Sequence, residues 1–321
     1  MNKYLRLLFD REFRFSVLTA RGLYKNMPDE KFIEKKFYLS LGTHLNLAPP
    51  RTFNEKMQWL KLHDRNPIYT NLVDKLAVRE YIKEKIGEKY LIPILAGPWG
   101  SPAEIDYDTL PNQFVLKCTH DSGGLLVIKD KAKMDKAKAE AFLNKRLKRN
   151  YFFGCREWPY KNVKPMIFAE KFLENPGSDS LYVYKIMCFN GTPKIFQVIQ
   201  NDKTDHETID YFDTSWSLLN IKQNFSNSPR PLEKPACMEE MLELAKKLSK
   251  GFAFLRTDFY EVAGQIFFSE LTFYSDGGFA PFEPPEWDEI LGSWIELPGS
   301  ADTDADAPED KAGEIEKAPA L

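Results

Sequence analysis

FLRTDFYEVAGQIFFSELTFY, residues 254–274, is the stretch that decides the fold. Two runs rich in apolar and aromatic residues flank the dipeptide Ala263-Gly264, and this pattern predicts a β-hairpin with a tight turn. Asp258 stands within the first run and Glu270 within the second. The stretch therefore predicts two paired strands that bear an acidic pair.

Further short strands are predicted before this hairpin. Two apolar runs flank Asn190-Gly191, which is a strong signal for a second hairpin. An earlier pair of short apolar runs flanks a loop of small residues at 119–124, and a Lys-rich helix follows. The predicted strands are 114–117, 125–128, 166–173, 182–189, 194–199, 254–260 and 266–273. The predicted helices of this part are 135–148 and 238–250, whereas 201–234 reads as a loop, so the fold class is α+β.

The first 74 residues read as helices, and Thr52 is a predicted N-cap. Another helix is predicted over 74–86, where Lys75 opens it and Gly87 ends it. A strand is predicted at 91–95. The tail from Pro298 onwards has almost no large apolar side chains, so it is expected to be disordered.

The amino-acid composition excludes several classes of function. The 321 residues are 43% hydrophobic and carry a net charge of -3, which predicts a globular protein and argues against a nucleic-acid partner. The N-terminal 22 residues have neither a signal-peptide core nor a membrane span. The four cysteines, which show no C-x-x-C pair, argue against a zinc site or a disulfide framework. We therefore expect a cytoplasmic protein with reduced thiols.

Segments in order along the chain carry side chains suited to ATP. Phosphoryl transfer spreads negative charge over phosphate oxygens, so a site needs fixed cations, which Lys75, Lys117 and Arg256 can supply. The loop 119–124, with adjacent glycines, can close its backbone N–H groups over phosphates. The acidic pair of the hairpin offers hard oxygen ligands for Mg²⁺. The Walker A pattern is absent from the sequence.

This serial order resembles the ATP-grasp superfamily and, within it, the teichuronopeptide-biosynthesis (TupA-like) group. The resemblance covers about 53–291. Its carriers are DKLAVREYI, FVLKCTHDSGG, REWPYKNVKP with IFAEKFLE, YKIMCFNG, and the opening stretch with EWDEILG. Several of these also look like segments of D-alanine–D-alanine ligases.

The resemblance implies an ATP-grasp fold in which two α+β subdomains hold ATP and Mg²⁺ between them. It divides the chain into a mainly helical region (1–110), a lid subdomain (111–172), a catalytic subdomain (173–297) and the tail (298–321). Phosphate contacts are implied for Lys75 and Lys117, and a mobile lid for Ser122, Gly123 and Gly124. Other nucleotide contacts are implied at Glu170, Lys171 and Leu173, with adenine held by backbone groups, and at Lys185.

The implied metal ligands are Asp258, Glu270 and Thr272, of which Thr272 stands where many ATP-grasp enzymes have Asn. Arg256 and Lys117 are the implied catalytic residues, with Arg256 on the reacting phosphoryl or acyl oxygens. Val183 stands where an acidic residue is expected to bind ribose, so either Asp179 or Glu174 substitutes for it or the ribose contacts are weak.

The function implied is an ATP-dependent carboxylate–amine ligase that joins an amino acid to a uronic acid of a surface polysaccharide or its precursor through an acyl phosphate. A glycosyltransferase is the alternative, because Asp106-Tyr-Asp108 matches the Asp-x-Asp pattern of metal-dependent glycosyltransferases. A kinase or an inactive binding module is a third hypothesis.

Other residues have two interpretations each. His120 either donates to a phosphate or shapes its turn. Arg156, Trp158 and Tyr160 either receive a sugar or anionic substrate or pack within a loop. The segment 274–282 is favoured as a substrate-side loop, although its aromatics suit a core equally. The first helix, with apolar residues among Lys and Arg, either packs on its own domain, which is favoured, or lies on the inner face of a membrane.

Overall fold

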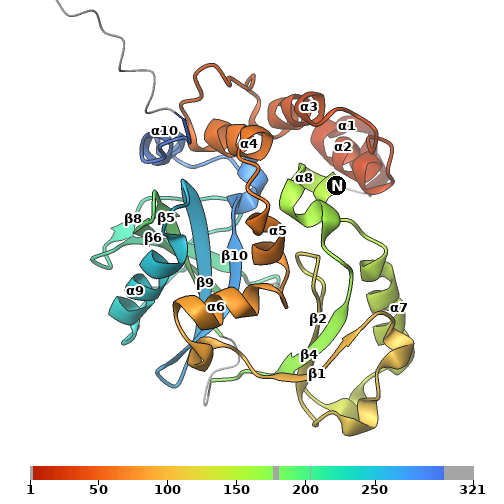
Figure 1. Cartoon of the computed structure of the whole chain (residues 1–321). Helices are drawn as coiled ribbons and strands as arrows, with labels where there is room; N and C mark the ends of the chain where they lie inside the picture. The colour runs from red at the N-terminus through yellow and green to blue at the C-terminus, as the bar shows by residue number, and fades with distance from the viewer. Residues whose placement is uncertain (1–2, 176–180, 203, 300–321) are drawn as a thin grey trace, which may run out of the picture.

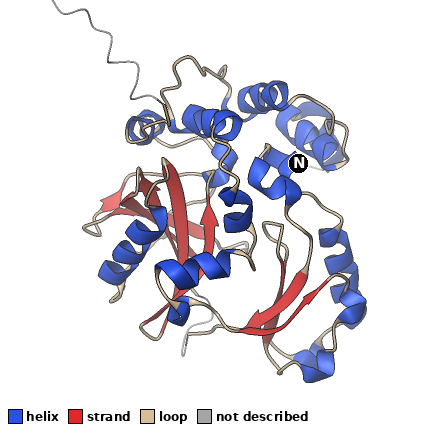
Figure 2. Ribbon diagram, in the orientation of Figure 1, coloured by secondary structure: helices blue, strands red, loops and turns tan. Residues whose placement is uncertain are grey.

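The computed structural model describes residues 3–175, 181–202 and 204–299. Within them, two antiparallel sheets lie side by side, and helices of the N-terminal part run along the top of both (Figures 1 and 2). This arrangement agrees with the predicted α+β class. Asp179 and most of the predicted tail fall outside the described residues.

Six strands form the larger sheet, in the order β10-β9-β5-β6-β7-β8. Both predicted hairpins are confirmed, since β5 pairs with β6 and β9 pairs with β10. Asn190 and Gly191 have φ values of 49° and 77°, and Ala263 and Gly264 have 50° and 80°. Two successive positive φ values are those of a type I′ turn. The strands are β5 (Val183–Phe189), β6 (Thr192–Gln200), β7 (Thr208–Asp213), β8 (Leu218–Leu219), β9 (Phe254–Val262) and β10 (Gln265–Thr272).

The prediction of a loop over 201–234 is wrong, because β7 and β8 lie within it. β7 pairs along its whole length with β6, from Ile195 opposite Asp213 to Gln200 opposite Thr208. β7 is buried because it pairs with β6, although its own sequence is not a long apolar run. Short strands of mixed polarity are decided by such tertiary pairing, which the local sequence does not display.

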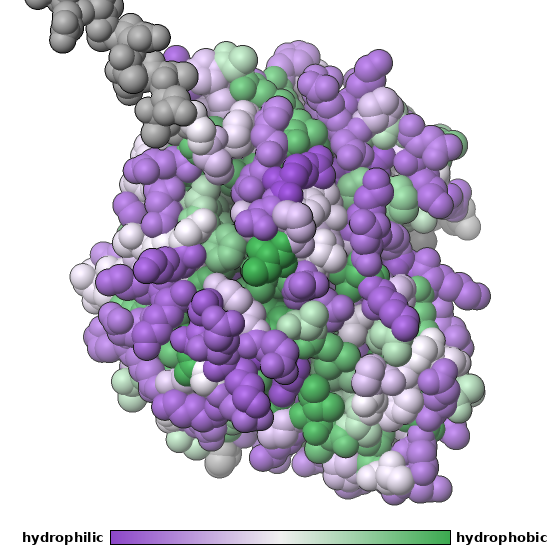
Figure 3. Space-filling model, viewed as in Figure 1, coloured by the Kyte–Doolittle hydropathy of each residue, from purple (hydrophilic) through white to green (hydrophobic). Residues whose placement is uncertain are grey.

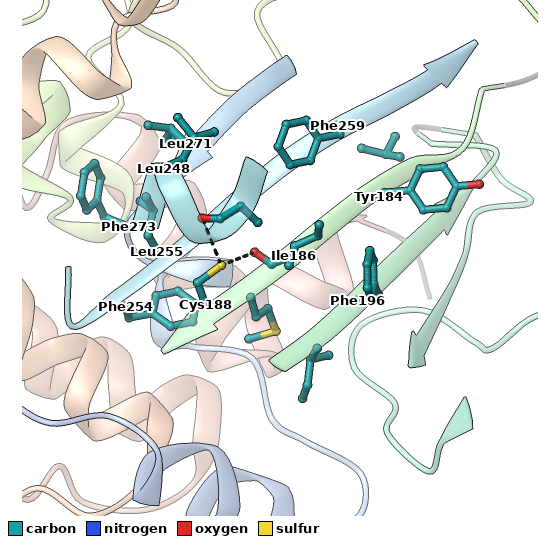
Figure 4. Close-up of a cluster of buried hydrophobic side chains, with 14 of the residues drawn as sticks. Tyr184, Ile186, Cys188, Phe196, Leu248, Phe254, Leu255, Phe259, Leu271 and Phe273 are labelled. Atoms are coloured by element: carbon teal, nitrogen blue, oxygen red, sulfur yellow. Dashed lines mark hydrogen bonds between the residues drawn. The ribbon is translucent and has the colours of Figure 1, made fainter. Parts of the chain in front are cut away.

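Helix α9 (Met238–Ser249) covers one face of the larger sheet (Figure 1). Met241, Leu244, Ala245 and Leu248 recur at helical spacing and are buried in the same core as β5 and β9. The side chains of Ile186, Phe254, Phe259 and others gather there around Cys188 (Figure 4). Each such Leu or Phe contributes about 1.5–3 kcal/mol by leaving water, so this core holds the hairpin that carries the acidic pair.

The smaller sheet has the order β1-β4-β2-β3. Its strands are β1 (Ile94–Trp99), β2 (Phe114–Cys118), β3 (Leu125–Ile128) and β4 (Ile167–Lys171), and helix α7 (Lys136–Leu147) packs beside it. β1 begins later than the predicted strand at 91–95, because Leu91 instead forms a bridge to Phe268 of the larger sheet. β1 also pairs with β4 although it precedes residue 111, so the small sheet draws on the region predicted as mainly helical.

Glycine permits the close approach of β1 to β4. A Cβ atom on Gly97 would lie 3.0 Å from the Cα of Phe168, and the φ of 103° at this residue is one that other residues rarely adopt. A side chain here would push β1 off the sheet, which explains why a glycine interrupts an otherwise apolar strand.

The N-terminal half supplies α1 (Lys3–Phe9), α2 (Arg11–Ala20), α3 (Asp29–Leu41), α4 (Phe53–His63), α5 (Ile68–Val73) and α6 (Val78–Lys85). Thr52 is confirmed as an N-cap: its hydroxyl accepts from the Glu55 backbone, and the Glu55 carboxylate accepts from the Thr52 backbone. α4 packs against α10 (Glu286–Ser293) at Gly292, where an added Cβ would lie 2.2 Å from the Arg51 carbonyl oxygen.

The prediction that Lys75 opens a helix is wrong. α6 begins only at Val78, and Lys75 lies in the turn that follows α5. The Asp74 carboxylate accepts from the backbone N–H groups of Leu76 and Ala77, at 2.8 and 3.2 Å, which stabilises the turn. This turn is what places Lys75 beside the glycine loop, because its backbone N–H donates to the Thr119 carbonyl at 3.2 Å.

Arg156 connects the N-terminal helices to the rest of the molecule. It follows α8 (Phe152–Cys155) with a left-handed φ of 58°, and its buried guanidinium donates to the carbonyls of Tyr24 and Met27. It also pairs with Asp29 at 3.0 Å and lies over the Phe32 ring. These contacts show that the Arg156 side chain packs within the protein. The interpretation that it binds a sugar or an anionic substrate is wrong.

Hydrophilic side chains cover most of the face seen in Figure 3, and hydrophobic ones gather in patches over its middle and lower parts. Across the described residues, no helix combines the length and the apolar content that crossing a bilayer requires.

Candidate functional site

A cavity of about 220 Å³ lies between the two sheets and collects most of the predicted site residues. The glycine loop after β2 closes it from the smaller sheet, and β5, β9 and β10 line it from the larger one. The predicted residues on its wall are Lys75, Lys117, Ser122, Gly123, Gly124, Lys185, Arg256, Asp258, Glu270 and Thr272. The structure thus brings together residues that are almost 200 positions apart.

The hairpin β9–β10 presents four polar side chains on one face. Residues two apart on a strand point to the same side, so Arg256 lies beside Asp258 and Thr272 beside Glu270. Across the hairpin, Asp258 is opposite Glu270 and Arg256 is opposite Thr272. The pairing register of β9 and β10 therefore brings these four side chains together.

Arg256 and Asp258 form a buried bidentate pair. The guanidinium Nε and Nη2 atoms each donate to one carboxylate oxygen at 2.8 Å. Nη2 also donates to the Thr272 hydroxyl at 3.1 Å and lies 3.6 Å from Glu270. Burial opposes the charge of Arg256, but Asp258 and Glu270 outweigh it and raise the pKa of the guanidinium. Arg256 is consequently a fixed cation.

Lys117 and Lys75 face this group from the other side of the cavity. Lys117 pairs with Glu170 at 3.1 Å, and both side chains are nearly buried. Burial opposes the charge of Lys117, but Glu170 outweighs it and raises the pKa of its ammonium. Lys75 donates to the Asp121 carbonyl at 3.0 Å and lies 3.8 Å from Glu270. Both lysines are therefore held as cations at the cavity wall.

The glycine loop is held by α7. The Arg146 guanidinium donates to the Ser122 carbonyl at 2.6 Å and pairs with the buried Asp121 at 2.5 Å. A Cβ atom on Gly124 would lie 3.1 Å from the Asp121 carboxylate, so a larger residue would disturb this turn. His120 is buried with its Nε2 atom 3.2 Å from the Arg146 carbonyl, and burial lowers its pKa. Its contacts favour the turn-shaping interpretation.

The predicted adenine segment lies at the edge of this site. Glu170 lines a small adjoining cavity with Lys75, Lys117 and Ser269. Lys171 is exposed, and its backbone N–H donates to the Pro93 carbonyl at 2.9 Å. Leu173 is buried with Ile92 and Phe267. Neither of the last two residues lines the main cavity, so their contact with adenine stays a prediction. Of the residues proposed for ribose, Glu174 is exposed.

Two residues of the cavity wall are not predicted by the sequence: Glu157 adds a carboxylate, and Tyr151 adds an aromatic ring. Asp276, within the predicted substrate-side segment, adds a second carboxylate. Tyr160 and Tyr274 also line the wall, and both are buried in the large core, so the two interpretations of their segments stay open. Trp158 instead packs on Tyr69 and donates to the Asp64 carbonyl at 3.1 Å. The sequence gives one indication for Glu157: it lies between Arg156 and Trp158, which are candidates for binding a sugar or an anionic substrate.

The buried Lys61 of α4 fixes the segment after β10. Its ammonium donates to the Gln58 side chain at 2.9 Å and to the carbonyls of Cys155 and Gly277 at 3.0 and 2.5 Å. Burial lowers the pKa of Lys61 to about 8, against the opposing effects of Cys155 and Glu157. Lys61 thus positions two parts of the cavity wall without itself lining it.

Asp106 and Asp108 do not belong to the cavity wall. The Asp106 carboxylate accepts from the Asp108 backbone N–H at 3.0 Å and so caps η3 (Tyr107–Thr109). This is a local turn motif, and it accounts for the Asp-x-Asp spacing without a metal.

The profile of the family described as TupA-like ATPgrasp matches residues 55–296, which is 242 of the 321 residues. The chain belongs to the TupA-like ATP-grasp family. The match spans both sheets and every residue of the cavity wall named above. It also confirms the resemblance inferred from the sequence motifs.

Solved structures that resemble this TupA-like protein are ATP-grasp ligases of low sequence identity. The N5-carboxyaminoimidazole synthetase from Staphylococcus aureus is 16% identical over 71% of this chain and 53% of its own, with a TM-score of 0.37. The L-amino acid ligase from Bacillus licheniformis is 14% identical over 85% and 57%, with a TM-score of 0.43. The D-alanine–D-alanine ligase from Bacillus anthracis complexed with ATP is 14% identical over 82% of each chain, with a TM-score of 0.38.

The TupA-like chain spans about half the length of the carboxyaminoimidazole synthetases that it matches. No curated protein matches it.

ATP-grasp enzymes use ATP and Mg²⁺, and the donor set of this TupA-like protein fits both. Lys75, Lys117 and Arg256 supply three cations for a triphosphate, and Gly123 offers backbone without a side chain. Among the described residues, no three His, Cys, Asp or Glu side chains form a ready metal cage. The pair Asp258 and Glu270 suits Mg²⁺, which usually takes one or two carboxylates together with phosphate oxygens and water.

Proposed function

We propose that this protein is an ATP-dependent carboxylate–amine ligase. One observation carries the proposal: three fixed cations, a glycine loop and a carboxylate pair in register converge on one cavity between two sheets. Such a site neutralises a triphosphate and stabilises the charge that develops when a phosphoryl group moves to a carboxylate oxygen.

The proposed reaction makes a carboxylate oxygen into a leaving group. ATP phosphorylates the substrate carboxylate, an amine attacks the carbonyl carbon of the acyl phosphate, and an amide, ADP and phosphate result. Asp258, Glu270 and the Thr272 hydroxyl would hold Mg²⁺, which would supply positive charge to the phosphates. Lys117 would hold phosphate oxygens, and Arg256, which is buried, would hold the reacting oxygens. In this proposal the side chains of the cavity wall position the substrates and supply charge, and none of them forms a covalent bond to a substrate.

The substrates are a finer part of the proposal. By resemblance to the TupA-like group, the acid is a uronic acid of a surface polysaccharide or its precursor, and the amine is an amino acid. A matrix of uronic acids crossed with amino acids, read by release of ADP, tests this pairing. Release that depends on both partners supports the ligase, whereas release without any amine supports the kinase hypothesis.

A cytoplasmic location belongs to the same proposal. ATP is abundant there, and the four cysteines are free thiols in the structure, of which Cys118, Cys188 and Cys237 are buried and Cys155 is half-buried.

Nucleotide preference separates the ligase from the glycosyltransferase. We expect ATP with Mg²⁺ to raise the melting temperature, because a ligand that binds only the native state stabilises it by about 2.7 kcal/mol at a hundred times its Kd. UDP-sugars with Mg²⁺ should leave it unchanged. Thermal-shift measurements with each nucleotide at equal concentration check this, and a shift with UDP-sugars alone would contradict the ligase.

Peripheral contact with an anionic membrane is a further proposal about the partner. α1 packs on α2, yet Leu8 and Phe9 remain 66% and 75% exposed, and Leu5 lies on the same face. Six basic and two acidic residues in the first 25 positions suit an anionic lipid surface.

Cosedimentation with vesicles checks this contact. We expect the protein to bind vesicles that contain phosphatidylserine and not purely zwitterionic ones, and Phe9→Ser with Leu8→Ser should abolish the binding. Equal sedimentation of this double variant would argue against a role for α1.

A further inference from the structure

Glu157 is a further carboxylate on the cavity wall. It follows the left-handed turn at Arg156 that ends α8 and stands just before η5 (Trp158–Asn162). Its side chain lines the cavity although the residue is only 4% exposed. A carboxylate is therefore directed into an enclosed space.

The charge of Glu157 is left without a direct partner. None of the hydrogen bonds or ion pairs among the described residues reaches its carboxylate. Lys61 is its strongest cationic neighbour, but that ammonium is already engaged by Gln58, Cys155 and Gly277. A buried carboxylate in this position calls for a cationic or hydrogen-bond-donating ligand, because an unpaired charge in an enclosed site is costly.

Three tyrosines, Tyr151, Tyr160 and Tyr274, share the cavity wall with this carboxylate. Glu157 is the largest cause of the raised pKa of Tyr151 and contributes, after burial, to the raised pKa of Tyr160. Tyr274 also lines this cavity, and its pKa is raised by burial and by Asp64 before Glu157. All three rings thus stay neutral, and aromatic faces beside a carboxylate are a set that recognises an ammonium group.

We propose that Glu157 binds the amino group of the amine substrate and receives its proton. This inference rests on the proposed ligase function and assigns one residue of its cavity wall. Arg256, which would hold the reacting oxygens, lines the same cavity as Glu157. The same wall thereby offers Lys75 and Lys117 to anionic groups and Glu157 to an ammonium group.

The proton transfer completes the chemistry. An ammonium nitrogen has no lone pair, so one N–H proton passes to the Glu157 carboxylate before attack. The nitrogen then bonds to the carbonyl carbon, the bond from that carbon to the phosphate oxygen breaks, and phosphate leaves with the electron pair. The second proton of the nitrogen is lost to the departing phosphate. Burial raises the pKa of Glu157 to about 7 against the pull of Lys61 and Arg256, which suits a group that takes up and returns a proton.

Glu157→Gln tests the inference because it keeps the shape and removes the charge. We expect the KM for the amino acid that gives the fastest ADP release to rise about tenfold to a hundredfold, the scale of one lost charge-assisted hydrogen bond. The thermal shift with ATP and Mg²⁺ should match the wild type. Hydroxylamine, which is an uncharged nucleophile at neutral pH, should still trap the acyl phosphate as a hydroxamate.

Matched variants keep the outcomes distinct. Glu243→Gln removes an exposed carboxylate of α9 and should change nothing. Glu157→Asp should recover part of the amine affinity, because it restores the charge. An unchanged amine KM in Glu157→Gln overturns the inference while the ligase function stands. Loss of hydroxamate as well, with no recovery in Glu157→Asp, also overturns it by assigning Glu157 to structure. No amine-dependent ADP release from the wild type would instead overturn the proposed function.

Discussion

Glu270→Gln is expected to lower Mg²⁺-dependent turnover by about three powers of ten, the scale of one lost charged contact to the reacting group, while the stability of the fold changes by less than about 0.5 kcal/mol. The Glu270 side chain is 32% exposed toward the cavity, and its ion pairs with Lys75 and Arg256 are long, at 3.8 and 3.6 Å. Gln keeps the shape but is a weaker ligand for Mg²⁺. ADP release and thermal melting check the two parts of the prediction.

Asp258→Asn is expected to differ from Glu270→Gln in its effect on stability. It should lower turnover similarly, but it also removes the carboxylate from a buried bidentate pair and leaves the Arg256 guanidinium with only the longer ion pair to Glu270. Removing one partner of such a pair costs about 3–5 kcal/mol, so this variant should melt at a clearly lower temperature. Near-wild-type turnover in both variants would refute the metal assignment, and equal stability losses would refute the distinction between them.

Lys117→Met carries the second large effect. We expect ATP affinity or kcat to fall by two to three powers of ten, about 3–4 kcal/mol, because a preorganised cation is lost from the phosphate site. The change also leaves Glu170 as an unpaired carboxylate whose side chain is 7% exposed. Kinetics measured over a range of ATP concentrations separate the loss of affinity from the loss of kcat.

A double variant separates function from stability. Lys117→Met with Glu170→Gln removes both charges of the pair, so it should recover much of the melting temperature but none of the activity. Asp108→Asn, outside the cavity, should behave as the wild type. Activity that is lost in Asp108→Asn and retained in Lys117→Met would transfer the assignment to the glycosyltransferase.

Local patterns predicted much of the framework. The turn dipeptides Asn190-Gly191 and Ala263-Gly264 determine backbone twist within two residues, so both hairpins could be predicted from sequence. Strands β7 and β8 could not, because their pairing partner lies elsewhere in the chain. The position of Lys75 in a turn could not be predicted, because the Asp74 side chain that stabilises this turn is of a type that also suits a helix start.

The site was predictable only in part, for the same reason. Family motifs located the cations, the glycine loop and the acidic hairpin, yet the bidentate contact of Arg256 with Asp258 depends on side-chain conformation. Glu157 has no motif of its own. Its significance comes from rings contributed by Tyr151, Tyr160 and Tyr274, which only the folded chain brings to the same cavity wall.

The ion pairs of the cavity wall have a thermodynamic consequence. Lys117 is matched with Glu170, Arg256 with Asp258, and Lys75 approaches Glu270, so the site neutralises itself internally. A triphosphate that recruits these cations must displace their carboxylates, and a divalent metal compensates the charge so released. Nucleotide and metal should therefore bind as a coupled pair, each raising the affinity for the other by the same factor. A rise in the concentration of ATP alone or of Mg²⁺ alone would then leave most of the sites empty. The site would be filled only when both ligands are present together.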